Sequence, residues 1–319
     1  MKQYAIGIDV GGTAIKIGLF DINGRLIYKC QFPTNRNGGS EGILADIKVI
    51  CIEMAHKNGI DFKDIIGAGM GVPGTVNKDG FLGNGSANIG WGRFNPATEL
   101  GRLLGIPVKV ANDANVAALG EQRYGVGNGY PNMVMVTLGT GIGGGIIVEG
   151  NMVTGFSGAA GEIGHICVNN NETIPCGCGR YGCLEQYASA TGIVRVAKEH
   201  LEKNKMESVL KLETLTAKKV FEALKSGDSL AKSVVEEFAD YLGRGLAAVA
   251  MVTNPEMIVI GGGVSKAGNI LLAYLEPAFQ KYARREGVKF SIAKLGNDAG
   301  IYGAVEMVLS ERKLIETGF

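Results

Sequence analysis

Three cysteines and a histidine are spaced in this sequence as the ligands of a metal ion are. Cys176, Cys178 and Cys183 form a C-x-C-x₄-C run, and His165 lies eleven residues before the first of them. Three thiolates and one imidazole make a closed tetrahedral set of the kind that holds structural zinc, with no position left open for a reacting ligand. The run therefore predicts a structural Zn²⁺ site at these four residues. The alternative is a group of unpaired buried thiols.

The other three cysteines, Cys30, Cys51 and Cys167, are isolated and stand in apolar surroundings. We expect them to be buried free thiols. Asp9 and Lys16 interrupt the apolar run that an export signal would need at this end of the chain. We therefore expect a cytoplasmic protein, and disulfides are rare in that compartment.

The 50 glycines of the chain gather in a few loops, and the first of these follows a predicted strand. It consists of Asp9, Val10, Gly11, Gly12 and Thr13. Backbone N–H groups freed by glycine can point at phosphate oxygens, and the threonine adds a hydroxyl donor. An acidic side chain beside phosphate requires a cation between them, so Asp9 is predicted to bind Mg²⁺, directly or through water. Taken alone, such a hairpin is as often a plain turn.

Two further glycine loops repeat the same chemistry. One contains Gly139, Thr140 and Gly141 and continues to Gly145, and the other is Gly261-Gly262-Gly263, where an adenine or ribose could lie against bare backbone. Three such loops, each directly after a strand, indicate a nucleotide site. The sequence has no G-x-x-x-x-G-K-[ST] motif, so the site is not of the Walker type.

Asn112 and Asp113 come at the carboxyl end of a predicted strand, which is where open α/β folds bind ligands. A carboxylate there can accept the proton of a sugar hydroxyl that attacks a phosphate, while Asn112 holds a neighbouring hydroxyl. The alternative is a helix N-cap, since Asn and Asp are favoured there, and the spacing favours neither. Glu162, His165 and Glu185 add polar groups of the kind that bind sugar hydroxyls.

The elements that position these motifs form a repeated pattern. The predicted strands cover residues 4–8, 15–20, a third strand through 32, 65–72, 108–110, 133–138, 146–148 and 257–260. The predicted helices cover residues 41–58, 96–104, 114–119, 190–210, 217–225 and 229–253. Because the strand, glycine turn and strand unit occurs twice, we predict a duplicated α/β fold with a cleft between its halves. Residues 246–252 are apolar on nearly every helical face, which predicts a buried core helix or, alternatively, a subunit interface.

The composition is typical of a globular protein, with 46% hydrophobic and 20% charged residues. Lys and Arg number 32 against 31 for Asp and Glu, a net charge of +1. Proteins that bind nucleic acid usually carry a basic surplus, so this balance argues against such a partner. The longest uncharged stretch, residues 124–148, is broken by Pro131 and many glycines, so we expect no membrane span.

Together, the motifs resemble those of the ROK family of bacterial sugar kinases and repressors. The resemblance rests on the Asp9–Thr13 loop, Asn112-Asp113, the loop of residues 138–145, the Glu162-x-Gly164-His165 box, and the cysteine run that leads into Leu184-Glu185. It extends over essentially the whole chain, to the Asn297-Asp298-Ala299-Gly300 segment. Many members have Lys directly after the threonine of the first loop, where this chain has Ala14 and carries Lys16 two residues on.

The resemblance implies an actin- and hexokinase-like fold, that is, a duplicated ribonuclease H-like fold of two lobes. The smaller lobe would hold residues 1–115 and 301–319, and the larger, residues 116–300, would carry the zinc loop. The resemblance also implies that Asp113 is the general base. The residues implied to contact the sugar are Asn88, Asn112, Asp113, Glu162, His165 and Glu185. His165 would bind zinc through one nitrogen and face the sugar with the other.

The expected activity is ATP-dependent phosphorylation of a hexose, most simply glucose to glucose 6-phosphate, by a homodimer or homotetramer. Alternatives are an N-acetylmannosamine, N-acetylglucosamine or fructose kinase of the same family, and a non-catalytic sugar-sensing regulator. An actin-like ATPase would not need the glutamate–histidine box. The repressors of the family add an N-terminal helix-turn-helix, and the first strand at Tyr4 leaves no room for one, so we expect no nucleic-acid partner.

Overall fold

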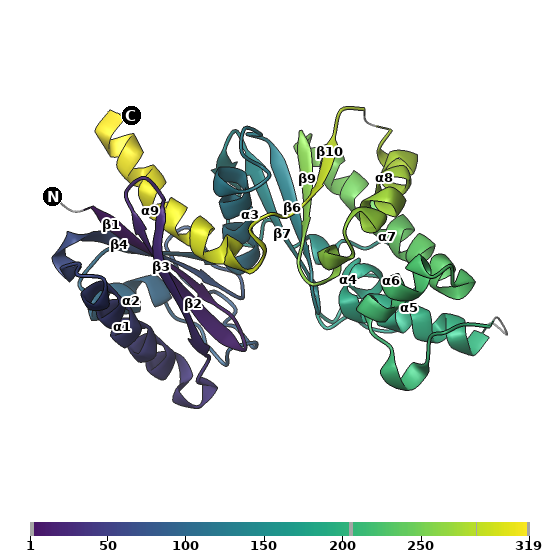
Figure 1. Ribbon diagram of the computed structural model, residues 1–319, viewed down its shortest axis with the longest axis horizontal. Helices are drawn as coiled ribbons and strands as arrows, with labels where there is room; N and C mark the ends of the chain where they lie inside the picture. Colours follow the sequence, from purple (N-terminus) through teal and green to yellow (C-terminus); the bar gives the residue numbers. More distant parts are fainter. Residues whose placement is uncertain (1–2, 204–206, 285, 318–319) are drawn as a thin grey trace. The chain divides into compact units, whose positions relative to one another are not determined.

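The computed structural model describes residues 3–203, 207–284 and 286–317. The chain forms two compact units and two five-stranded sheets, shown in Figure 1. The first unit comprises Met1–Gly129, Gly150–Gly161 and Leu295–Phe319, and the second comprises Tyr130–Glu149 and Glu162–Lys294. The lobe boundaries expected after residues 115 and 300 stay predictions.

The first sheet has the strand order β3-β2-β1-β4-β5. Its strands are β1 (Tyr4–Val10), β2 (Ala14–Asp21), β3 (Leu26–Pro33), β4 (Ile65–Val72) and β5 (Val108–Asn112). β1 is antiparallel to β2 and parallel to β4. β2 is antiparallel to β3, and β4 is parallel to β5. The predicted antiparallel start of the chain is confirmed.

The second sheet repeats this arrangement in the order β10-β9-β6-β7-β8. Its strands are β6 (Met133–Leu138), β7 (Ile142–Val148), β8 (Asn151–Met152), β9 (Met257–Gly261) and β10 (Lys289–Ile292). β6 is antiparallel to β7 and parallel to β9, which is parallel to β10. In each sheet, therefore, the first strand in sequence has an antiparallel neighbour on one side and two successive parallel strands on the other. The duplicated α/β fold is confirmed.

Helices surround both sheets. In the first unit they are α1 (Gly39–Lys57), α2 (Pro96–Leu104), α3 (Asp113–Tyr124) and α9 (Ala299–Thr317), with 3-10 turns η1 (Arg36–Gly38), η2 (Phe62–Asp64) and η6 (Gly296–Asp298). In the second unit they are α4 (Glu185–Ala188), α5 (Ala190–Lys203), α6 (Ala217–Lys225), α7 (Ser229–Thr253) and α8 (Asn269–Ala283), with 3-10 turns η3 (Ile163–His165), η4 (Leu212–Thr214) and η5 (Val264–Ala267).

The two faces of the first sheet pack against different helices because side chains alternate along a strand. Ile6 and Ile8 join the apolar cluster that α1 and α2 cover. Ala5 points the other way and packs with Ile301 of α9, which runs beside this sheet in Figure 1. A Cβ at Gly7 would lie 2.0 Å from the Ile301 carbonyl oxygen. Only glycine at this position lets the backbone of α9 approach the sheet so closely.

The helices predicted at residues 96–104, 217–225 and 229–253 are confirmed with the same bounds. The helix predicted for residues 190–210 is too long, since α5 ends at Lys203 and the described residues 207–210 are not helical. The physical reason is a competing partner. Asp228, at the start of α7, accepts hydrogen bonds from Ser208 Oγ and the Val209 N–H, which holds this segment in a non-helical form.

The apolar stretch near the end of α7 is only partly buried. Leu246 and Ala250 are inaccessible and lie four residues apart on one helical stripe. Met251 and Val252 lie off that stripe and are 60% and 87% exposed, so full burial of residues 246–252 was a wrong expectation. None of the described helices has both the length and the apolar character of a membrane span.

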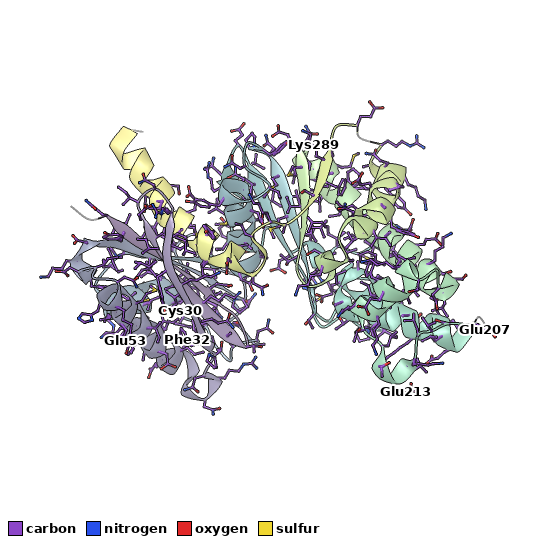
Figure 2. The ribbon with its side chains drawn as sticks, viewed as in Figure 1. Cys30, Phe32, Glu53, Glu207, Glu213 and Lys289 are labelled. Atoms are coloured by element: carbon purple, nitrogen blue, oxygen red, sulfur yellow. The ribbon has the colours of Figure 1, made fainter. Side chains whose placement is uncertain are left out.

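The isolated cysteines differ in burial, although all are free thiols. Cys51 in α1 is buried as predicted. Cys30 is half-buried and, with Phe32, lies on the side of β3 that packs toward α1, where Figure 2 also labels Glu53. Cys167 is exposed, which contradicts the prediction; it lies in an irregular segment outside the named helices and strands.

Candidate active site

The first glycine loop, Gly11-Gly12-Thr13, closes the hairpin between β1 and β2 and is braced by residues that follow β3. The Gly11 N–H donates to Ala14 O at 3.0 Å. Thr34 Oγ1 donates to Gly11 O at 2.6 Å, and Arg36 Nε donates to Gly12 O at 2.9 Å. Because these donors engage its carbonyl oxygens, the loop has a fixed shape of the kind that can present N–H groups to an anion.

Asp9 at the end of β1 lies next to Lys16 of β2. Lys16 Nζ is 3.4 Å from Asp9 Oδ2 and donates to Asn297 O at 2.6 Å. Burial raises the pKa of Asp9, and the Lys16 ammonium opposes that rise. A carboxylate can bind a cation and an ammonium can bind phosphate, so the pair suits a metal–phosphate group. The sequence reading did not assign this pairing to Lys16. The hairpin register could have found it, since Asp9 and Lys16 are directly opposed.

Asn112 is the N-cap of α3. Its Oδ1 accepts the N–H groups of Ala114 and Asn115 at 2.9 and 3.1 Å, and its Nδ2 donates to Gly74 O at 3.1 Å. Asp113, the next residue, is half-buried, and its Oδ1 accepts the Ala114 N–H at 2.8 Å. The spacing left open whether these two residues supply a general base or a helix cap. Asn112 takes the capping role, and the role of Asp113 as base stays a prediction. Asp113 stands at the carboxyl end of β5, in the position where a ligand-facing carboxylate was expected.

Asn88 is exposed at the tip of a turn beside the first glycine loop. The turn is closed by two backbone hydrogen bonds between Ser86 and Trp91, at 2.8 and 3.0 Å. A Cβ on Gly12 would come within 3.1 Å of Asn88 O, so the two backbones almost touch. The first unit thus brings Asn88 close to the first loop.

The second glycine loop, Gly139-Thr140-Gly141, closes the hairpin between β6 and β7, and the third loop packs directly on it. Gly262 has φ of +82°, and a Cβ there would lie 2.5 Å from Leu138 O. Only glycine combines this backbone conformation with such an approach. The second and third loops predicted from the sequence therefore meet in the second unit.

A cavity of about 520 Å³ opens beside the second loop. Its lining includes Thr140, Thr191, Arg195 and Lys198, together with the start of α6. The η5 turn, which follows the third loop, also packs against α6. The cavity therefore adjoins the second glycine loop, and it has the size and mixed lining of a small-molecule site.

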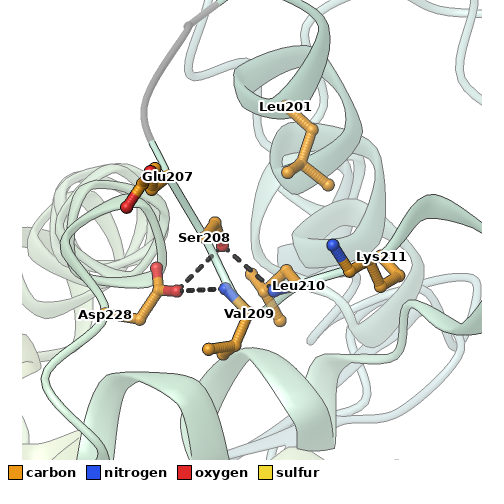
Figure 3. Close-up of a pocket in the computed structure, with 7 residues that line it drawn as sticks. All are labelled: Leu201, Glu207, Ser208, Val209, Leu210, Lys211 and Asp228. Atoms are coloured by element: carbon orange, nitrogen blue, oxygen red, sulfur yellow. Dashed lines mark hydrogen bonds between the residues drawn. The ribbon is translucent and has the colours of Figure 1, made fainter.

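A cavity of about 610 Å³, shown in Figure 3, lies elsewhere in the second unit. Its one carboxylate with several partners is Asp228, the N-cap of α7, which accepts the Ala231 N–H at 2.8 Å as well as the hydrogen bonds from Ser208 and Val209. That carboxylate serves the helix start and the segment before it. The lining contains none of the predicted site residues.

The predicted metal ligands do converge. One ligand atom from each of His165, Cys176, Cys178 and Cys183 lies within 4.8 Å of the others. Cys178 Sγ is 3.6 Å from Cys183 Sγ, and His165 Nδ1 is 3.8 Å from Cys176 Sγ. Three sulfur atoms and one imidazole nitrogen at this spacing fit a tetrahedral ion of the zinc type. The cluster can hold a metal.

The thiols of the cluster are tuned by their surroundings. Burial raises the pKa of Cys178, but hydrogen bonds from the Arg180 backbone and side chain and from neighbouring thiols outweigh it and hold the pKa at about 6. Burial, together with hydrogen bonds to Cys178 and Cys176, raises the pKa of Cys183 to about 12. These surroundings therefore favour the thiolate form of Cys178, which suits a donor set for a cation.

Two carboxylates lie next to His165, one beside each of its ring nitrogens. Glu185 Oε1 lies 3.9 Å from His165 Nδ1 and 3.3 Å from Cys176 Sγ. Glu162 Oε2 lies 3.9 Å from His165 Nε2. Glu185 Oε2 also accepts the Ile142 N–H at 3.2 Å, which ties the cluster to the second glycine loop. The second unit thus brings Glu162, His165 and Glu185 together as predicted. Their contact with sugar stays a prediction.

The supports of the cluster were missed by the sequence reading. Glu172 Oε2 and Arg195 Nη1 form an ion pair at 2.8 Å. Thr191 Oγ1 donates a hydrogen bond to Thr140 O at 2.7 Å. None of these residues belongs to a ligand motif, and they come from different segments. No local spacing signal could have found them.

Comparison with known proteins agrees with the predicted resemblance. A family model described as the ROK family matches residues 5–311. The chain is 44% identical over 325 residues to a glucokinase of Halalkalibacterium halodurans, covering 99% of this chain and 98% of that protein. It is 35% identical to a glucokinase of Thermotoga maritima, covering 96% of this chain and 98% of that protein. A crystal structure of a ROK family glucokinase from Streptomyces griseus in complex with glucose and AMPPNP is 33% identical, with a TM-score of 0.77, and covers 95% of this chain and 98% of that chain.

Proposed function

Because the chain belongs to the ROK family, we propose that it is an ATP-dependent glucokinase that converts glucose to glucose 6-phosphate. The full-length similarity to glucokinases carries the proposal. It is supported by the groups that such a reaction needs, namely a carboxylate at a strand end, glycine loops after three strands, and a metal-ligand cluster flanked by two carboxylates.

Asp113 is the proposed general base. It takes the proton of the attacking glucose hydroxyl, so that the oxygen becomes nucleophilic as it approaches the γ-phosphate. The other sugar hydroxyls are held by side chains that accept and donate hydrogen bonds. In this proposal they are Asn88, Asn112, Glu162, His165 and Glu185. Since Asn112 already caps α3, its contribution to the sugar would come from its Nδ2 group.

The glycine loops hold the nucleotide in this proposal. Gly11, Gly12 and Thr13 bind phosphate through N–H and hydroxyl donors, as do Gly139, Thr140 and Gly141. Gly261, Gly262 and Gly263 and the cavity beside Thr140 take the adenosine. Asp9 would hold Mg²⁺, which when bound would supply positive charge to neutralise the nucleotide phosphates. Lys16 balances Asp9 from the facing strand.

His165, Cys176, Cys178 and Cys183 hold Zn²⁺ in this proposal, and the ion stiffens the loop that carries the sugar-binding side chains. A closed set of four protein ligands leaves no coordination position for substrate, so these residues position sugar rather than activate it. The working enzyme is proposed to be a homodimer or homotetramer in the cytoplasm, where ATP is supplied.

A coupled ADP-release assay with purified protein tests the proposal. The panel is glucose, N-acetylmannosamine, N-acetylglucosamine and fructose, each with MgATP. We expect the highest kcat/KM with glucose. A preference for one of the other three sugars would move the enzyme to that kinase class. No turnover with any hexose, together with measurable glucose binding, would identify a sugar-sensing regulator instead.

A further inference from the structure

Glu172 lies in the segment that joins two of the candidate metal ligands, and both of its carboxylate oxygens are fully engaged. Oε1 accepts the backbone N–H groups of Thr173 and Ile174, each at 3.0 Å. Oε2 accepts the hydroxyl of Tyr187 and pairs with Arg195 Nη1 at 2.8 Å. The side chain is 9% exposed. A carboxylate with four donors around it has its acceptor capacity filled, and no acceptor site is left for a water molecule.

The surroundings of the Glu172 carboxylate favour its charged form. Burial alone would raise its pKa, but the hydrogen bonds from Tyr187, the Ile174 N–H and Arg195 together hold it at about 2. Charge-assisted hydrogen bonds in a water-poor site are the strong kind. The interaction is therefore a fixed link at working pH.

Arg195 is held from three sides. Besides Glu172, its Nε donates to Gln186 O at 3.2 Å, and its guanidinium lies 4.7 Å from the centre of the Tyr187 ring. That ring stacks on Tyr241 of α7 at 4.0 Å. A planar guanidinium fixed by a carboxylate, a carbonyl and an aromatic face has little freedom to move.

Gln186 connects Arg195 to the cysteine run by a second route. Its Oε1 accepts the Cys183 N–H at 3.0 Å, and its Nε2 donates to Ile174 O at 2.8 Å. The segment that holds the candidate metal ligands is thus also attached to Gln186 of α4, whose carbonyl oxygen accepts the hydrogen bond from Arg195 Nε. Arg195 in turn lines the cavity beside Thr140.

We propose that Glu172, Tyr187 and Arg195 form a clasp that couples metal binding to nucleotide binding in the second unit. The ion fixes the segment that carries Glu172, Glu172 fixes Arg195, and Arg195 fixes one wall of the cavity beside Thr140. The inference rests on the proposed function, since it takes that cavity as the nucleotide pocket. Because coupling between two ligands is reciprocal, bound nucleotide must also tighten the hold on the metal.

The test measures both sides of this coupling in the full-length protein and in Glu172→Gln. ADP affinity is measured by calorimetry with zinc bound and after removal of zinc by a chelator. Zinc affinity is measured by competition with a chelating dye, with and without ADP. In the wild type, we expect zinc removal to weaken ADP binding by about fivefold or more, and ADP to tighten zinc by the same factor. In Glu172→Gln, we expect both factors to fall below about twofold, since a neutral amide cannot hold the guanidinium as a carboxylate does.

The coupling factor is the ratio of one ligand's affinity with and without the other ligand, and it distinguishes the clasp from a merely structural role. A variant that only loosens the fold lowers both affinities but leaves their ratio with and without the other ligand unchanged. Glu199→Gln is the matched control, because Glu199 Oε1 also approaches Arg195, at 3.9 Å, but lies outside the metal segment. It should keep the wild-type factor. Tyr187→Phe keeps the ring stack and removes one donor to Glu172, so it should give an intermediate factor if Glu172→Gln does not fold.

The outcomes decide between the two proposals. A wild-type factor of one, an unchanged factor in Glu172→Gln, or purified protein that binds no zinc overturns the clasp. Neither measurement contains a hexose, so neither depends on turnover. Coupling in a protein that phosphorylates no hexose would therefore reject the proposed glucokinase and leave the clasp in place. A protein that does not bind ADP would reject both.

Discussion

The glycine loops of the first and second units close equivalent hairpins, but different parts of the chain brace them. The first loop is braced by Thr34 and Arg36, which directly follow the strand next to it. The second is braced by residues that come after the cysteine run, since Glu185 accepts an N–H at the end of the loop and Ala190 and Thr191 donate to its carbonyl oxygens. The second loop therefore depends on a segment that a metal would organise, whereas the first does not.

The difference teaches how a duplicated fold can specialise. The first hairpin is braced by residues that directly follow a strand of its own sheet, so its loop is complete as soon as that sheet forms. The second hairpin is braced from α4 and α5, which follow the largely irregular residues 153–184, and that segment needs something to order it because ordering backbone costs about 1–2 kcal/mol per residue. A cluster of three cysteines and a histidine can supply that order through metal binding.

The largest expected effect falls on chemistry in the first unit and leaves the metal untouched. Asp113→Asn should lower kcat by at least about 10²-fold because the proton of the attacking hydroxyl loses its acceptor, while glucose affinity changes by only a few fold. Steady-state kinetics and a zinc assay measure both. Asp61→Asn, at a capping position in the same unit where Asn also caps well, is the control and should be nearly neutral. Near-normal turnover in Asp113→Asn would reject the assignment.

The next effect tests whether the second unit needs its ion. Cys178→Ser should lower zinc content and weaken glucose binding by about tenfold or more, and it should weaken ATP binding less, since Glu185 contacts the cluster directly whereas the lining of the cavity beside Thr140 contains none of the four cluster residues. Metal analysis and calorimetry measure these changes. Cys167→Ser is the matched control, because Cys167 is nearby and exposed but is not one of the four converging residues. A full equivalent of zinc in Cys178→Ser would remove the basis for the comparison.

A smaller effect should show that the first loop is independent of the ion. Arg36→Ala removes the brace on Gly12 O and should raise the KM for ATP by about fivefold to tenfold, in line with the loss of the exposed charge-assisted hydrogen bonds from Arg36 Nε and Nη2. Zinc affinity should stay at the wild-type value. If Arg36→Ala weakened zinc binding as much as ATP binding, the two loops would not be braced separately.

The smallest expected effect is a dependence of stability on pH. The pKa of Glu172 is lowered from 4.5 to about 2, so its contribution is fully present above pH 4.5 and is lost as the pH falls toward 2. Metal-free Glu172→Gln should melt about 2–4 °C below the metal-free wild type at pH 6, and this gap should shrink at pH 3. Thermal unfolding followed by circular dichroism measures the gap. A gap that stays constant between the two pH values would show that the Glu172 charge does not stabilise the segment.

Local patterns predicted the parts of this molecule that depend on local physics. The strand ending before Asp113 and the cysteine run could be found because an apolar run or a ligand spacing lies within a few residues. The clasp could not, because Glu172 and Arg195 meet only after the chain folds back between them. The end of α5 was misplaced for the same reason, since Asp228 lies beyond any local window.

The approach of α9 to Gly7 has a consequence for how the protein is made. Apolar side chains on one face of the first sheet pack against Ile301 and its neighbours in α9. These α9 residues leave the ribosome long after β1 to β4. At a typical rate of synthesis this interval is roughly ten to fifty seconds. The second unit, mostly continuous from Glu162 to Lys294, can finish earlier. Until α9 is made, the nascent chain therefore carries apolar side chains of one face of this sheet without their native cover, and molecular chaperones bind surfaces of that kind.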